Sequence, residues 1–400
     1  MLLVLMVGAA LAGGNDAKKA DAKAADKAPD FTPSLQVRPR LETHTGRDGD
    51  SDTESALMVS QRARVGGTMK FGDASAKVIV QDIRVWGMET NTLTDPIADI
   101  VDFHEAYVTW KPHKAVNFKV GRQEVAIHEH RLVGTVDWAQ QGRSFDGGRF
   151  SLKNENLSMD LFSAILKEGD LIDVEEKDIN VTMLRAGYAK KKEGVQADVL
   201  AVLDNDGELE LSRQTVGVYA KGKTGILSGR VEGYYQMGSL GDADIGAWMA
   251  GVRATVAPDM AGKPTFTLWY DQLSGDDDMT DSDIKAFNTL YATNHKFYGH
   301  MDIAGFGVAS AADGRGLQDI ALKVAAKPVK GLGVNVDLHQ FMFSDDQGGD
   351  EGSLGQEADV WGKYAVNKHF AIAAGGAVFM PAADDTDNDM WGWLQLDAKY

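Results

Sequence analysis

The chain has 400 residues, a formal net charge of −18 and no cysteine. The negative charge argues against general nucleic-acid affinity, and the lack of cysteine excludes disulfides and thiolate metal sites. No internal stretch offers about 18 uninterrupted apolar residues, so a membrane-spanning helix is excluded. The 44 glycines suit a chain with many turns.

The N-terminus has the pattern of a secretion signal. Residues 2–11 form an apolar run of signal-peptide length, and Ala10-Leu11-Ala12 offers a small-x-small cleavage site. We therefore expect a signal peptide at 1–12, with a buried helix as the alternative reading. Residues 13–32 are rich in Ala, Lys and Asp and predict a flexible periplasmic leader. A single domain is expected at 33–400.

From residue 33 onward, runs of roughly ten residues alternate apolar with polar side chains and end in a turn or an acidic loop. In the run 56–71, Val65 and Met69 fall on one face, whereas Arg62 and Arg64 fall on the other. Because side chains alternate across a strand, each run predicts a two-faced strand. A soluble sandwich would turn the apolar face inward. The many charged residues on the second face favour lipid outside and water inside.

The pattern predicts an all-β fold, a transmembrane antiparallel up-and-down β-barrel of about 18 strands in the bacterial outer membrane. The predicted strands are 33–42, 56–71, 74–86, 102–111, 115–124, 144–153, 157–166, 179–191, 194–203, 211–222, 225–237, 246–257, 264–273, 316–327, 331–343, 357–366, 369–380 and 390–400. The faces of 74–86 and 179–191 are ambiguous. The stretch 274–315 is long enough for a short helix or two extra strands. A barrel of this size leaves an aqueous channel unless loops fold into it.

The most distinctive motif lies at 121–151. It comprises Gly121-Arg122-Gln123, Arg131-Leu132-Val133-Gly134, Asp137-Trp138, Arg143-Ser144-Phe145-Asp146-Gly147 and Arg149. This order and spacing resemble the alginate export porin family. The resemblance implies an eighteen-stranded outer-membrane porin whose charged constriction passes an anionic polysaccharide. It further implies a basic pore lining with acidic partners, made of Arg122, Arg131, Arg143, Arg149, Asp137 and Asp146.

Physical chemistry favours arginine for such cargo. A polyuronate carries one carboxylate per sugar, and conduction requires several weak sites rather than one tight site. The planar guanidinium meets a carboxylate through two parallel hydrogen bonds and stays charged. Salt-bridge ladders that stiffen the barrel are the alternative role for these charges. Further candidates for the lumen wall are Arg62, Arg64, Asp82, Arg84, Arg230 and Arg253.

The family pattern breaks at 126–130, where this chain reads Ala-Ile-His-Glu-His. His128 and His130 would point the same way in an extended segment and could share a metal ion. No third ligand is evident, so we favour a solvated or pore-facing loop and assign no metal site. Acidic loops at 276–283, 345–351 and 384–389 could bind Ca²⁺, although the EF-hand spacing is absent and hydrated loops are the alternative.

Aromatic residues are expected in two places. Residues at strand ends that fit a girdle at the membrane interface are Trp110, Tyr188, Tyr235, Tyr270, Tyr364 and Tyr400. Strand parity instead places Trp138, Trp269, Trp361 and Trp393 in the lumen, where a flat ring can stack on a sugar. Known nucleotide-binding, hydrolase and zinc-protease motifs are missing, and Ser144 near the histidines lacks a spacing argument. We therefore expect no enzyme activity.

The residues together predict a monomeric outer-membrane channel for passive diffusion of anionic solutes. The family resemblance favours export of a polyuronate or alginate-like polysaccharide. Outer-membrane lipid and lipopolysaccharide are the other expected partners, nucleic acid is not, and no cofactor is assigned apart from the Ca²⁺ considered above. Two alternatives stay open, namely a general non-selective porin and a structural or adhesive barrel plugged by the loop 274–315.

Overall fold

The computed structural model describes residues 29–45, 56–88, 101–168, 178–278, 280–302, 314–345, 352–382 and 387–400. The expected signal peptide and the expected leader up to residue 28 lie outside these residues. The first strand begins at Asp30, inside the last part of the expected leader. Within the described part of the chain, no helix has the length and apolar character needed to cross a membrane.

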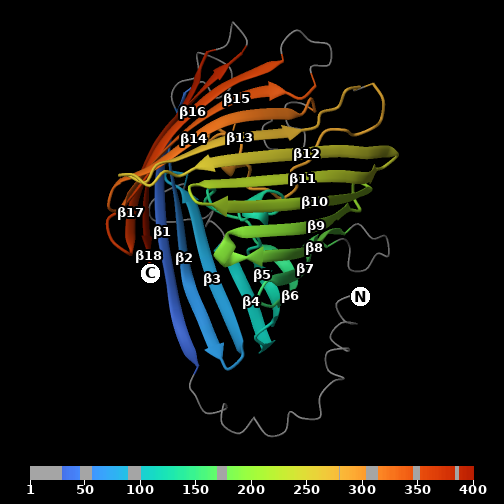
Figure 1. Cartoon of the computed structure of the whole chain (residues 1–400). Helices are drawn as coiled ribbons and strands as arrows, with labels where there is room; N and C mark the ends of the chain where they lie inside the picture. Colours follow the sequence, from blue (N-terminus) through green and yellow to red (C-terminus); the bar gives the residue numbers. More distant parts are fainter. Residues whose placement is uncertain are drawn as a thin grey trace.

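Eighteen antiparallel strands form one sheet, which closes because β1 pairs with both β2 and β18 (Figure 1). The strands are β1 (Asp30–Thr45), β2 (Ala56–Phe71), β3 (Ala74–Val85), β4 (Asp102–His113), β5 (Val116–Gln123), β6 (Phe145–Lys153), β7 (Leu157–Lys167), β8 (Ile179–Lys190), β9 (Val195–Asp206), β10 (Leu211–Thr224), β11 (Leu227–Leu240), β12 (Ala243–Val256), β13 (Thr265–Leu273), β14 (Leu317–Val329), β15 (Leu332–Phe343), β16 (Ser353–Ala365), β17 (Phe370–Pro381) and β18 (Asp389–Lys399). The described residues also contain the short 3-10 turns η2 (His128–His130), η3 (Lys191–Glu193) and η4 (Asn294–Lys296). The predicted all-β barrel and each of its predicted strands are confirmed.

The strands are inverted relative to those of a soluble protein. On β11 and β12, the apolar Val231 and Val252 are 52% and 49% exposed, whereas the neighbouring Arg230 and Arg253 are buried. Because side chains alternate across a strand, the apolar residues face outward and the charged ones face the lumen. The expected girdle residues are exposed at all positions except the half-buried Tyr270.

The connections differ at the two ends of the barrel. One end has short turns such as 72–73, and the other has long connections such as 124–144 and 274–316. The connections 207–210 and 241–242 are short although they lie at the long-loop end. Long loops are expected outside the cell, so we assign this end to the external side. The described residues of 274–316 contain η4 and neither a longer helix nor an added barrel strand.

The outward band gives a test of the membrane orientation. Val252 lies on β12 between the exposed Trp248 and Val256, near the middle of the lipid-facing surface. We expect Val252→Arg to lower the free energy of unfolding by about 2–4 kcal/mol, and Val256→Arg near the strand end to lower it by about 0–1 kcal/mol. Urea unfolding in lipid vesicles, followed by tryptophan fluorescence, measures both values. Equal losses at the two positions would contradict the orientation.

Candidate permeation pathway

Two long loops pair with each other inside the barrel. The first inward loop comprises residues 124–144, between β5 and β6, and the second comprises 274–302 without residue 279, after β13. The Gly134 N–H donates to the Tyr291 carbonyl at 2.8 Å, and the Tyr291 N–H donates to the Leu132 carbonyl at 2.9 Å. These bonds satisfy backbone groups that leave the barrel sheet, so the loops support each other as a short ribbon.

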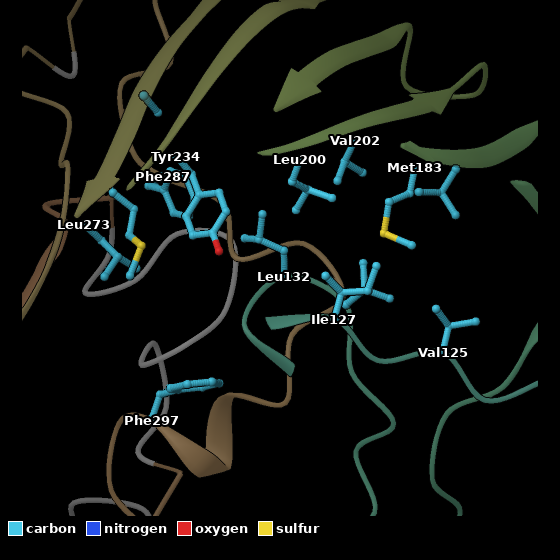
Figure 2. Packing of buried hydrophobic residues seen from close by; sticks show 14 of the residues in the cluster. Val125, Ile127, Leu132, Met183, Leu200, Val202, Tyr234, Leu273, Phe287 and Phe297 are labelled. Carbon is cyan, nitrogen blue, oxygen red and sulfur yellow. The ribbon is translucent and has the colours of Figure 1, made fainter. Parts of the chain in front are cut away.

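The inward loops pack against an apolar part of the lumen wall. Figure 2 shows Ile127 and Leu132 of the first loop and Phe287 and Phe297 of the second among buried wall side chains. The labelled residues of the wall are Met183, Leu200, Val202, Tyr234 and Leu273. Removing this apolar surface from water favours docking of the loops by the hydrophobic effect. The loops therefore narrow the lumen on the side of β8 to β13.

A buried ion-pair network clamps the first inward loop. The Arg131 guanidinium donates to Glu232 at 3.0 Å and to Asp271 at 2.7 Å, and all three side chains are at most 1% exposed. Arg230 bonds Glu232 at 2.9 Å, and Arg253 bonds Asp271 at 2.7 Å. Three arginines thus share two carboxylates. The structure places these predicted pore residues in a clamp between loop and wall.

The tip of the first inward loop has an unusual backbone. His128, Glu129 and His130 have φ values of 47°, 60° and 78°, in the left-handed region that residues other than glycine rarely adopt. The His128 ring contacts Asp198 at 3.1 Å through Nε2 and the Tyr234 hydroxyl at 3.0 Å through Nδ1. Both ring nitrogens are occupied by protein groups. The two histidines therefore do not present the shared metal site considered from the sequence.

Glu129 anchors the same tip through charge. Its carboxylate accepts from Arg230 at 2.6 Å and from Lys221 at 3.2 Å. Burial alone raises the pKa of Glu129, but Arg230 and Lys221 together lower it below its ordinary value. The carboxylate is therefore charged at neutral pH, and the tip is held by ion pairs as well as by ring contacts.

A row of arginines on β1 and β2 holds the segment 137–141 of the first inward loop. Arg38 donates to the carbonyl oxygens of residues 137, 138 and 139 at 2.7–3.1 Å, and Arg40 donates to that of residue 138 at 2.8 Å. Arg62 and Arg64 donate to the carbonyls of residues 140 and 141, each at 3.1 Å. Carbonyl oxygens carry no net charge, so these contacts do not neutralise the arginines.

A cavity of about 630 Å³ lies between this wall and the inward loops. The Asp137 carboxylate accepts from Arg62 at 2.9 Å and lies 3.7 Å from Arg64. The cavity places four basic side chains beside three acidic ones. They are Arg62, Arg64, Lys77 and Lys296 on the basic side and Glu105, Glu124 and Asp137 on the acidic side.

Arg122 and Asp146 form an ion pair at 2.7 Å, but on the outer face. Arg122 lies two residues from Val120 on the same strand and so shares its face, and Val120 is 59% exposed. Asp146 lies opposite Arg122 and opposite Ile165, which is 52% exposed. Directly opposite residues share a face of the sheet. The expectation that this pair lines the pore is therefore corrected. The pair lies near the external ends of β5 and β6.

Asp82 and Arg84 pair with each other at 2.7–2.9 Å, also on the outer face. Asp82 lies opposite Ala63 on β2, one position away from the inward Arg62. Their expected place in the lumen is corrected as well. The run 74–86 carries apolar residues on both faces, so its alternation does not identify the inward side.

The remaining predicted arginines face inward and are engaged with protein groups. Arg143 donates to the Tyr291 carbonyl and to the Ala292 carbonyl, the latter at 3.1 Å, and so fastens the second inward loop to the first. Arg149 bonds Asp160 at 2.8 Å on the lumen wall. Arg143 and Arg149 thus stabilise the barrel and its loops, which is the structural role considered above for salt-bridge ladders.

Tryptophan rings in the lumen also contact other protein side chains. Trp138 stacks on His295 at 4.6 Å between ring centroids and lies 4.2 Å from the Arg40 guanidinium. Trp391 and Trp393 meet the Trp138 ring edge-on at 5.6 and 4.9 Å. The expected sugar-stacking surface is thus engaged in internal contacts at Trp138.

Several residues in or near the cavity are not among the pore residues predicted from the sequence. Arg38 and Arg40 lie behind the cavity and could have been found, because they alternate with apolar residues in the predicted strand 33–42. Lys77 lies in the ambiguous run 74–86, and Lys296 lies in a loop without periodicity. Glu105 was also missed. It is an acidic residue of the lumen wall and forms an ion pair with Lys77 on the neighbouring strand.

A closed inside-out barrel with loops folded into a charged lumen defines an outer-membrane channel of the porin type, and its location is the bacterial outer membrane. The model of the alginate export family matches residues 32–384, so the chain belongs to this family. A search of curated proteins gives no match. Family and fold are those of channels, not of enzymes.

Solved porins share this fold. Pseudomonas aeruginosa OccK11 (OpdR) has a TM-score of 0.66 at 14% identity, with 92% of this chain and 96% of that chain covered. OprD from P. aeruginosa gives 0.63 at 13% identity, with 95% of each chain covered. P. aeruginosa OpdK, solved with vanillate, gives 0.60 at 14% identity, with 93% of this chain and 98% of that chain covered. At these identities the likeness concerns the fold alone.

The Arg131 clamp makes a testable prediction. Arg131→Met leaves Glu232 and Asp271 with less counter-charge in a buried site, and breaking such a pair costs about 3–5 kcal/mol. We expect the first inward loop to undock, which raises single-channel conductance in planar bilayers and speeds chymotrypsin cleavage within 124–144.

The matched control is Arg122→Met, which removes an exposed ion pair on the outer face. This change should alter the free energy of unfolding by less than about 1 kcal/mol and leave the conductance unchanged. If both variants raise conductance equally, or neither does, Arg131 is not a clamp.

Proposed function

We propose that this channel passes anionic solutes by passive diffusion, with a uronate polymer or oligomer as its cargo. The observation that carries the proposal is the row of Arg38, Arg40, Arg62 and Arg64, of which Arg62 and Arg64 line the cavity. Much of the hydrogen bonding of these arginines goes to backbone carbonyls rather than to carboxylates. Arg40 is also paired with Glu42 at 2.8 Å. The other three arginines share Asp137 and Glu124, which leaves a surplus of positive charge on this side of the lumen.

The acids near this row do not cancel it. Asp137 serves three of the arginines, at 2.9–3.9 Å, while its own side chain is 60% exposed. Glu124 is shared between Arg64 at 3.8 Å and His104 at 2.7 Å. A carboxylate on a passing solute can compete with Asp137 for the guanidinium groups, because the geometry of the two partners is the same.

The mechanism follows from weak, repeated contacts. Each sugar carboxylate exchanges from one guanidinium or ammonium group to the next, and no site holds it tightly because Asp137 and Glu124 compete. Lys296 of the second inward loop faces the same cavity, and its ammonium group donates to the Glu129 carbonyl at 3.4 Å. The concentration gradient supplies the driving force.

The neighbour solved with vanillate adds support of a general kind. That molecule is a carboxylate, and it was found with a porin of the same fold. The likeness favours an organic anion as the class of solute for this chain. The polysaccharide itself is favoured by membership of the alginate export family.

A plugged barrel is the second candidate function. The observation that favours it is the apolar core that both inward loops form with the wall inside the lumen (Figure 2). The cavity beside the arginine row favours a narrowed channel over a closed one. Conductance separates the two candidates directly.

The experiment is planar-bilayer recording of the refolded protein under a salt gradient, with and without uronate oligomers. We expect an anion-selective reversal potential and block by the oligomers. Arg64→Gln and Lys296→Gln should each weaken block by about tenfold or more, because a hydrogen bond to a charged group contributes about 1.5–3 kcal/mol.

Arg122→Gln is the matched control, since it removes the same charge from the outer face. This variant should keep the wild-type reversal potential and block. Ohmic conductance without selectivity would support a general porin, and no conductance would support the plugged barrel. Either result would reject the proposed selectivity.

A further inference from the structure

Three potential metal ligands meet on the lumen face of β15 and β16, outside the cavity described above. Asp337, His339 and Asp359 each offer a donor atom, and these atoms all lie within 4.8 Å of one another. The three residues are 9%, 3% and 0% exposed. Among the described residues, this is the group of His, Cys, Asp and Glu whose geometry fits a metal ion.

The strand pairing makes this arrangement costly without a cation. Asp337 and Asp359 are directly opposite each other in the antiparallel ladder of β15 and β16. Like charges at directly opposite positions destabilise a sheet, and burial increases the penalty. Lys323 bonds Asp337 at 2.9 Å and compensates one of the two carboxylates. Among the described residues, Asp359 forms no ion pair with a Lys or Arg side chain.

Unpartnered atoms point into the same group. Both carboxylate oxygens of Asp359 and the Nε2 atom of His339 are buried and have no hydrogen-bond partner. Burying such atoms without a partner costs free energy, so they call for an explanation. The Glu357 carboxyl group contacts Asp359 and can donate to it only when protonated. A shared proton is therefore the rival explanation.

The surroundings of His339 favour a metal ligand. Its Nδ1 atom lies 2.8 Å from the Asp319 carboxylate, which is fully buried. A carboxylate that accepts from Nδ1 leaves the Nε2 lone pair free, as in the outer shell of many histidine metal sites. In the described part of the chain, the Lys323 ammonium group is the basic neighbour of Asp319, Asp337 and Asp359.

We propose that Asp337, His339 and Asp359 bind a divalent transition-metal ion on the lumen wall. One imidazole nitrogen and two carboxylate oxygens suit Zn²⁺ and, with more open positions, Mn²⁺ or Fe²⁺. Ca²⁺ and Mg²⁺ are less suited, because they prefer oxygen ligands throughout. The bound charge compensates the opposed aspartates and cross-links β15 to β16.

The site also bears on the second inward loop. Glu357, directly opposite His339, accepts from the backbone N–H groups of His300 and Met301 at 2.6 and 2.8 Å. Glu357 thus anchors the loop from a position beside the proposed metal. A cation at Asp359 would lie next to the carboxyl group that anchors the loop and would offset the repulsion between the neighbouring carboxylates.

The test is metal retention by the full chain. The protein is refolded with ZnCl₂ or with MnCl₂ and desalted, and bound metal per folded chain is measured by mass spectrometry. We expect about one ion per chain. Asp359→Asn and His339→Gln should abolish retention, and Asp319→Asn should weaken affinity by about 10–100-fold. Asp397→Asn, a buried carboxylate on β18, is the matched control and should retain the ion.

X-ray absorption on the zinc-loaded wild-type protein does not depend on the folding of any variant. We expect an imidazole nitrogen and oxygen ligands at about 2.0–2.2 Å. No retained metal in the wild-type chain would overturn the proposal and favour the shared proton. Equal retention in all variants, or a spectrum without imidazole, would assign the metal to exposed acidic loops and would overturn it as well.

Discussion

Closure of the sheet is the constraint on which the rest of this structure depends. A membrane offers no water to backbone groups, so every strand must have two neighbours, and β1 therefore pairs with β18 as well as with β2. Eighteen strands enclose more space than wall side chains can fill. The lumen must then hold water or loops. Here the loops 124–144 and 274–302 occupy part of it, and the arginine wall of β1 and β2 borders the space that they leave.

The strands were predictable because the cause of their pattern is local. Lipid on one side and water on the other impose alternation residue by residue, and Val231 beside Arg230 shows the pattern in two positions. Alternation does not identify the inward face where both faces of a strand carry similar residues, as at Asp82 and Arg84. It also fails near strand ends, where the outer face leaves the hydrocarbon region and tolerates charge, as at Arg122 and Asp146. A motif resemblance could not correct these faces, since it supplies residue types and not their orientation.

The site was less predictable because long-range contacts decide it. Arg131, Arg230 and Arg253 have the sequence pattern expected of a pore lining, yet they share Glu232 and Asp271 in a dry clamp. Strand pairing already places Arg230, Arg253, Glu232 and Asp271 side by side on the wall. Only the docking of the first inward loop adds Arg131, and periodicity contains no information on that docking. The wall residues beneath the loop, such as Met183, face inward although they are apolar. An inward apolar residue in a barrel strand is therefore a sign that a loop covers it.

The lumen has walls of opposite sign, and this asymmetry connects the two proposals. Arg38, Arg40, Arg62 and Arg64 line β1 and β2, whereas acidic residues gather on β14 to β16 around His339. An anion in the lumen is drawn toward the first wall and repelled by the second, so free acids there would oppose its passage. A divalent cation at Asp337 and Asp359 removes much of that repulsion without adding a basic side chain. Glu357, which holds the second inward loop through His300 and Met301, lies beside this ion, so the site borders both the acidic wall and a loop that narrows the channel.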